Sequence, residues 1–380
     1  MASASILEGA LSILREPDPH VKAALADSLA RAAATLPLRP ASSSSLSALV
    51  PPAKPARLPL PTVDPSKTPR RGKGGTLASR AAMLHALVHI ESWAIDLAAD
   101  CIARFACGAS SPPFPRALAT DFCVVCADEA RHFSLLEKRL HELGAEAEAA
   151  GGAGYTYGSF PVHDGLWESA ERTSGSLAAR LAVEHCTHEA RGLDVLPSTI
   201  AKFRRAGDHA TADLLENVVY PEEVRHCAAG VRWLAWMHAS AAGLGGEEAM
   251  RRACAAAGPP EGVSGGVEEA VAAAGAETQE EAEEQEPEGQ AGEGEGSWRA
   301  DAAHHATPAA WFRALVARHF YGNLRPPFNE EARAKAGFTR EWYWPKEEEA
   351  AVAAGERGGD RGEDGDTARR RDDDDQHQQE

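Results

Sequence analysis

Apolar residues recur at intervals of three and four positions along four long stretches of this sequence, a pattern that predicts four amphipathic helices. The stretches run from about 77 to 105, 116 to 143, 175 to 202 and 208 to 242. Because 43% of all residues are hydrophobic, the chain can form a buried core. The pattern therefore predicts an all-α domain in which four main helices pack against one another.

One five-residue pattern occurs in two of these predicted helices. Asp128-Glu129-Ala130-Arg131-His132 has its counterpart in Glu222-Glu223-Val224-Arg225-His226. A string of an acid, Glu, any residue, Arg and His should arise by chance only about 0.02 times in a chain of this composition. On a helix, a Glu and a His three residues later project from the same face and can bind one ion together. Each copy therefore predicts half of a dinuclear metal site.

The other two predicted helices each carry an acid on an apolar face. Glu91 shares its face with apolar residues one and two turns away on both sides, and a carboxylate buried there needs a cation. In the third helix, Glu184 and Glu189 both share a face with apolar residues, so periodicity does not decide between them. His85 and His89 lie off the face of Glu91, which favours a position on the surface or around the site over metal ligation.

The spacing of these acids along the chain indicates how the helices are connected. Glu91 and Glu129 are 38 residues apart and Glu189 and Glu223 are 34 apart, whereas 60 residues separate Glu129 from Glu189. Two antiparallel helix pairs with a long crossover between helices 2 and 3 form a ferritin-like four-helix bundle. Pro221 directly precedes the second motif and predicts a kink or a π-type bulge there.

Segments outside the bundle lack its long periodic pattern. Prolines prevent regular structure in the Pro/Ser-rich segment, which is either an extended arm lying over a domain or a solvated linker. The Ala/Gly/Glu-rich segment lacks apolar periodicity, which is typical of disorder. The predicted organisation is N-terminal helices packed on the bundle at 1–36, a Pro/Ser-rich arm at 37–76, the ferritin-like bundle at 77–243, a disordered acidic insertion at 244–303, a C-terminal helix and aromatic segment packed on the bundle at 304–345, and a disordered charged tail at 346–380.

Two segments carry the formal net charge of −18. Residues 261–300 contain twelve acids and one base, and residues 346–380 contain thirteen acids and six bases. The remainder has 32 of each, so the predicted folded part is neutral and shows no basic surface for nucleic acid. Seven cysteines without disulfide-type clustering, and the lack of any run of 18 apolar residues, favour a cytoplasmic protein with no membrane segment.

Four inward Glu and two His form the ligand set of di-iron and di-manganese carboxylate proteins. Four carboxylates balance the charge of two divalent ions, which makes their burial tolerable. We expect the acid before each motif Glu to orient the His of the opposite helix, so that Asp128 acts on His226 and Glu222 acts on His132. The arginines of the two motifs, expected to pair with outer acids, are Arg131 and Arg225.

Six stretches match motifs of a known family: His85–Glu91, Ala127–Phe133, Phe160–Trp167, Glu189–Val195, Glu222–His226 and Pro327–Arg333. In them the chain resembles the ferritin-like proteins grouped as domain of unknown function 455, over roughly residues 1–243 and 308–340. The family's Glu-Ala-Arg-Gly-Leu-Asp pattern implies Glu189 as the ligand of the third helix. The family is also similar, at a distance, to a di-iron monooxygenase that hydroxylates a modified tRNA adenosine.

The resemblance and the ligand set together predict a centre of two iron ions, with manganese as the alternative. We expect an O2-dependent oxidase or hydroxylase that acts on a small-molecule substrate with a reductant partner. Two other classes have the same ligands: a non-catalytic iron-binding or oxidative-stress protein, and a tRNA-modifying hydroxylase, which the neutral body disfavours. The predicted ligands are Glu91, Glu129, His132, Glu189, Glu223 and His226.

Overall fold

A computed structural model describes residues 4–40, 49–68, 71–106, 114–261, 266–274, 295–322 and 324–344. The chain divides into a main unit, Met1–Tyr343, and a second unit, Trp344–Glu380, of which only Trp344 is described. Over the described part of the main unit every regular element is a helix, apart from one isolated bridge between Thr62 and Val162. The all-α prediction is therefore confirmed. None of the described helices is both long and apolar enough to cross a membrane, and the predicted tail lies outside the described residues.

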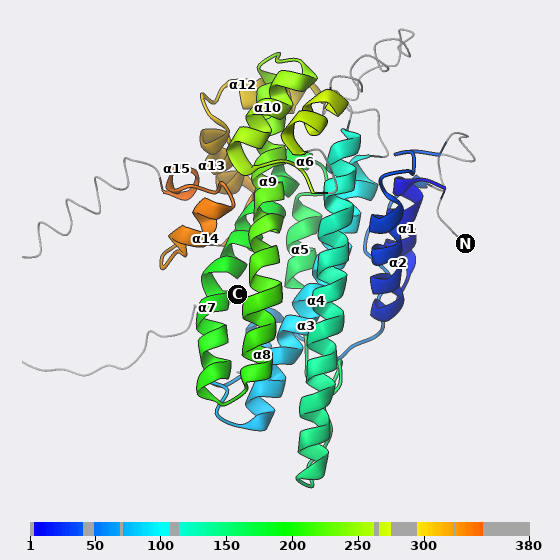
Figure 1. Cartoon of the computed structure of the whole chain (residues 1–380), viewed down its shortest axis with the longest axis vertical. Coiled ribbons are helices and arrows are strands. Elements are labelled where there is room, and N and C mark those ends of the chain that lie inside the picture. The colour runs from blue at the N-terminus through cyan, green and yellow to red at the C-terminus, as the bar shows by residue number, and fades with distance from the viewer. Residues whose placement is uncertain are drawn as a thin grey trace, which may run out of the picture. The chain divides into compact units, whose positions relative to one another are not determined.

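A bundle of four long helical segments forms the core of the main unit (Figure 1). The first two segments are α3 (Leu77–Phe105) and α4 (Arg116–Ala149), which pack against each other. The third and fourth segments also pack together, and each contains a π-helical stretch. Residues 150–176, which include α5 (Gly165–Arg172), form the long crossover expected between the second and third segments. The third segment consists of α6 (Leu177–Arg180), π-helical η3 (Leu181–His188) and α7 (Glu189–Arg205), and the fourth of α8 (His209–Leu214), π-helical η4 (Leu215–Val219) and α9 (Tyr220–Ala241).

Side-chain caps fix where several of these helices begin. The Thr76 hydroxyl accepts a hydrogen bond from the backbone N–H of Ser79 at the start of α3 (3.1 Å). The Asp208 carboxylate accepts one from the backbone N–H of Thr211 at the start of α8 (3.1 Å). Such caps satisfy donors that the first helical turn leaves unpaired, and each stabilises a helix by about 1 kcal/mol. These boundaries of the bundle are thus encoded locally in the sequence.

The fourth segment changes its winding just before the second motif. Pro221 has no N–H and would clash in the middle of an α-helix, but it lies in the first turn of α9, directly after η4. The wider turn of the π-helical stretch accommodates the irregularity. The predicted π-type distortion near Pro221 is therefore confirmed.

The third and fourth segments approach each other very closely where Gly230 of α9 faces His185 of η3. A Cβ atom at position 230 would lie 2.0 Å from the backbone oxygen of His185. No other amino acid leaves enough room, so this glycine sets the spacing between the two segments. The contact lies about two helical turns beyond the Glu of the second motif.

Two N-terminal helices, α1 (Ile6–Arg15) and α2 (Pro19–Ala32), lie along the bundle and pack on α3 and α4 (Figure 1). Lys22 of α2 forms a buried ion pair with Asp96 of α3. A buried carboxylate is tolerated only when it is paired or hydrogen-bonded. This pair therefore fixes the N-terminal helices to the first bundle segment.

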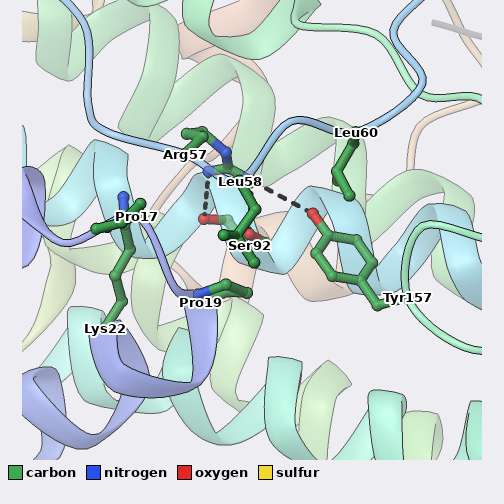
Figure 2. A pocket seen from close by; sticks show the side chains of 8 residues that line it. All are labelled: Pro17, Pro19, Lys22, Arg57, Leu58, Leu60, Ser92 and Tyr157. Atoms are coloured by element: carbon green, nitrogen blue, oxygen red, sulfur yellow. Dashed lines mark hydrogen bonds between the residues drawn. The ribbon is translucent and has the colours of Figure 1, made fainter.

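The described part of the Pro/Ser-rich arm crosses the outer face of α3, and Figure 2 shows its central contact. The Arg57 guanidinium donates to the Ser92 hydroxyl (2.6 Å), to the Tyr157 hydroxyl (3.3 Å) and to the Asp96 carboxylate (2.6 Å). Ser92 and Asp96 belong to α3, whereas Tyr157 belongs to the crossover. Between the two alternatives left by the sequence, an arm over a domain and a solvated linker, the structure has the arm.

The region predicted as a disordered insertion, 244–303, is helical over much of its described part. α10 (Gly246–Ala257) packs on α9, residues 266–274 include further helix, and α12 (Glu295–Ala303) follows. The disorder prediction is wrong for these helices because α10 is anchored largely through small side chains, which give a weak periodic signal. Residues 275–294 lie outside the described part of the chain. The buried residues of α10 are Ala249, Met250, Ala253 and Cys254.

The last described helices are α13 (Pro308–His319), α14 (Glu330–Lys335) and α15 (Arg340–Tyr343). Arg333 of α14 is fully buried and donates two hydrogen bonds to the Asp194 carboxylate of α7 (2.9 and 2.6 Å). Paired hydrogen bonds between a guanidinium and a carboxylate are among the stronger polar contacts in proteins. They fix the C-terminal segment to the third bundle segment. The rings around this guanidinium are those of Phe328, Phe338 and Tyr343.

Replacing Gly230 with Ala should destabilise the protein, because the new Cβ would overlap the backbone oxygen of His185. We expect the free energy of unfolding to fall by about 1–3 kcal/mol, as in other overpacked interiors, in urea denaturation. Gly192→Ala in α7 is the control, since nothing lies within 4 Å of its Cβ position. That variant should be as stable as the parent or more stable by up to about 1 kcal/mol. Equal stability of the two variants would contradict the close approach.

Candidate metal centre

Six carboxylate and imidazole side chains converge inside the bundle and form two overlapping groups. Within each group, one potential ligand atom of every residue lies within 4.8 Å of those of the others. Glu129 and Glu223 belong to both groups, so the groups adjoin. These are the six residues expected from the sequence, and their cluster could hold a metal ion. The first group is Glu91, Glu129, His132 and Glu223, and the second is Glu129, Glu189, Glu223 and His226.

All four bundle segments contribute to this cluster. In α4 and in α9, the Glu and the His stand three residues apart, a spacing that places both side chains on one face of the helix. Packed helices hold side chains in fixed positions more accurately than loops do. The cluster comprises Glu91 from α3, Glu129 and His132 from α4, Glu189 from the first turn of α7, and Glu223 and His226 from α9.

Most of the cluster is closed to solvent. Glu189 is half-buried, and the other five side chains are buried. Among the described residues, the Nδ1 atoms of His132 and His226 and the Oε2 atom of Glu129 form no well-aligned hydrogen bond, although all three atoms are buried. Buried polar atoms without partners cost stability. These inward-facing atoms therefore fit a bound cation.

The two imidazoles face the carboxylates through their Nδ1 atoms. Nδ1 of His132 lies 3.4 Å from Oε2 of Glu91 and 3.4 Å from Oε1 of Glu223. Nδ1 of His226 lies 2.9 Å from Oε1 of Glu129 and 3.7 Å from Oε2 of Glu223. Two ligand atoms that each lie about 2.1 Å from one ion are separated by roughly 3.0–3.4 Å at octahedral to tetrahedral angles. The separations in the cluster are close to this range.

Each imidazole is also held from outside by the first acid of the opposite motif. Nε2 of His132 lies 2.8 Å from Oε2 of Glu222, and Nε2 of His226 lies 3.4 Å from Oδ2 of Asp128. Both cross-helix pairs are those expected from the sequence. When Nε2–H is donated to an outer acid, Nδ1 keeps its lone pair for an ion inside the cluster.

Two partly exposed arginines bridge the outer acids. Nη2 of Arg131 lies 3.1 Å from Oδ1 of Asp128 and also contacts Glu222. Nη2 of Arg225 lies 3.0 Å from Oδ2 of Asp128 and 3.5 Å from Oε1 of Glu222. Burial would raise the pKa of Asp128, but hydrogen bonds from His226 and the arginines outweigh burial and hold that pKa well below its usual value. The outer acids therefore stay charged and keep accepting hydrogen bonds from the imidazoles.

The electrostatics of the cluster favour either extra protons or a cation. Burial, reinforced by neighbouring carboxylates, raises the pKa of Glu91 and of Glu189 well above the usual value. Burial would lower the pKa of His132 and of His226, but the surrounding acids outweigh it and raise both well above normal. Since metal ligands must be deprotonated, a bound cation would displace these protons.

The structure also places the other residues that the sequence analysis considered. Glu184, which periodicity left as an alternative in the third helix, lies outside the cluster. His85 and His89 are both buried, so a surface position is wrong for them. The backbone N–H of Gly158 donates to His85 (2.9 Å), and His89 is hydrogen-bonded to the Tyr157 hydroxyl (2.8 Å). Sequence periodicity missed this burial because the crossover covers a second face of α3.

Residues 15–259, more than half of the chain, match the family described as Protein of unknown function (DUF455). The chain belongs to this family. All six clustered residues lie within the matched region. A relative from Haemophilus influenzae, described as an uncharacterized protein, is 34% identical over 172 residues, which are 45% of this chain and 56% of that protein. The chain thus spans about half the length of this relative. No solved structure matches the chain.

The neighbours Glu222 and Glu223 provide a matched test of this geometry. Glu223→Gln removes a carboxylate shared by both groups and should abolish stable metal binding. Glu222→Gln removes the charged partner of His132 and should weaken metal affinity by only about 10- to 100-fold. Bound metal measured under graded competition with a chelator distinguishes the two effects. Equal behaviour of the variants would mean that the assignment of inner and outer acids is wrong.

Proposed function

We propose that this protein is a ferritin-like carboxylate protein that holds two iron ions and acts as an O2-dependent oxidase or hydroxylase on a small-molecule substrate. The observation that carries the proposal is the pair of overlapping groups, in which Nδ1 of His132 and of His226 are buried, face the carboxylates and form no well-aligned hydrogen bond with any described residue. Two imidazoles arranged in this way among four carboxylates match the donor set of dinuclear iron centres.

In this proposal, Glu129 and Glu223 would help to hold both ions, because these two acids belong to both groups. Glu91 and His132 would complete the surroundings of one ion, and Glu189 and His226 those of the other. Four carboxylates neutralise two divalent cations, which removes most of the electrostatic cost of burying them. The same donors accept manganese, which we keep as the alternative metal.

The proposal of catalysis rests on the access of small molecules to the cluster and on the inward orientation of the metal-ligating side chains. A reduced iron pair would supply electrons for the activation of dioxygen. Glu189 is the most exposed of the six residues, so its side of the cluster is the proposed approach for small molecules. Outside the two acidic segments the chain has equal numbers of acids and bases, which favours a small substrate over nucleic acid.

Oxygen consumption by the reduced, iron-loaded protein tests the proposed activity. With a chemical reductant in excess, we expect many equivalents of oxygen to be consumed per iron pair. Glu129→Ala should hold almost no iron and consume no oxygen above background. Glu142→Ala is the control on the same helix, because Glu142 is exposed and its contact with Arg139 contributes little. A single stoichiometric oxidation per site would instead support iron storage or scavenging.

A further inference from the structure

A second set of potential ligands lies outside the dinuclear cluster. Glu184 and His188 are four residues apart on η3, and Ser169 faces them from α5 of the crossover. The Ser169 hydroxyl donates to Oε1 of Glu184 (2.7 Å) and lies 3.3 Å from Nε2 of His188. The same Nε2 atom lies 3.7 Å from Oε2 of Glu184. One carboxylate, one imidazole and one hydroxyl thus converge from two elements.

The Glu184 carboxylate is left with an uncompensated oxygen. Its side chain is 0% exposed, and its Oε2 atom has no hydrogen-bond partner among the described residues. The described part of the chain places no Lys or Arg within ion-pair distance of this carboxylate. A buried carboxylate needs a cation or a proton to offset its desolvation. His188 is 22% exposed at its side chain, so solvent reaches the edge of this group.

The arrangement does not suit a serine nucleophile. In a catalytic triad the acid binds the imidazole nitrogen opposite to the one that faces the serine. Here both the hydroxyl and the carboxylate face Nε2 of His188, and the serine proton is donated to the carboxylate. The acid and the serine therefore do not lie on opposite sides of the imidazole, as a catalytic triad requires. Three donors around one point are better suited to binding an ion.

We propose that Glu184, His188 and Ser169 form a separate, mononuclear site for a divalent transition-metal ion such as zinc. Two ligand atoms at about 2.1 Å from one tetrahedral ion are roughly 3.4 Å apart, close to the separation of Oε2 and Nε2. A carboxylate and an imidazole are both common zinc ligands. Water supplies the remaining positions on the side where His188 reaches solvent.

The ion links two parts of the fold that are distant in sequence. Ser169 lies in the crossover, whereas Glu184 and His188 lie in the third bundle segment. With the ion bound, the negative charge of Glu184 is neutralised and α5 is attached to η3. This site does not depend on the function proposed for the dinuclear cluster, because the two sets share no residue.

Zinc titration of the iron-loaded full-length protein tests the site. A chromophoric zinc indicator reports bound zinc, and the iron content of the same sample reports the dinuclear cluster separately. We expect Glu184→Gln and His188→Ala to bind about one zinc fewer per chain than the parent, with iron content unchanged. Glu168→Gln, an exposed neighbour of Ser169, and His209→Ala, an exposed histidine, should bind zinc like the parent.

Thermal unfolding gives a second test, because the proposal predicts in which direction the unfolding temperature changes with and without zinc. Glu184→Gln keeps the shape of the side chain but removes a buried charge, so without zinc it should unfold at the same temperature as the parent or higher. Zinc should raise the unfolding temperature of the parent, and this rise should be lost in Glu184→Gln. If Glu184→Gln binds as much zinc as the parent, or shows the same zinc-dependent rise, the proposal is wrong.

Discussion

The interaction on which the structure depends is the burial of four carboxylates beside two imidazoles in the middle of a helical bundle. Acids in such a place repel one another and lose their hydration, and no apolar contact compensates for that loss. Bound divalent cations would compensate for it directly, and protons on the imidazoles and carboxylates are the alternative. The donors face inward from four helical segments, so the cluster also constrains how those segments can pack.

Hydrogen bonds around the cluster fix the relative positions of the helices that carry its side chains. Glu222 of α9 holds His132 of α4, and Asp128 of α4 holds His226 of α9, so the two helices are linked in both directions. Such links fix the rotation of each imidazole as well as the distance between the helices. About two turns further along α9, Gly230 allows η3 to approach closely and sets the position of the third segment.

Contacts outside the bundle support the same four segments. Arg333 binds Asp194 on the helix that begins with Glu189, and it is covered by aromatic rings of the C-terminal segment. On the opposite flank, Arg57 of the arm shares the buried Asp96 with Lys22 of the N-terminal helices. These flanking residues are remote in sequence from the motifs, yet they hold the helices that carry the clustered side chains.

Much of this arrangement could be predicted from the sequence because the signals are local. The repeated motif places Glu and His on one helical face, and the spacing of the acids reveals the long crossover. Periodicity did not decide between Glu184 and Glu189, because the π-helical η3 interrupts the α-helical period between them. It also missed α10, where small side chains pack on α9, and the burial of His85, which depends on a distant loop. These features depend on tertiary contacts that a helical period does not encode.

Electron paramagnetic resonance of the fully oxidised, iron-loaded protein tests the central claim most directly. Two ferric ions that share Glu129 and Glu223 should couple antiferromagnetically and give no signal in the ground state. A signal of isolated high-spin ferric ions that accounts for the bound iron would contradict a shared dinuclear centre.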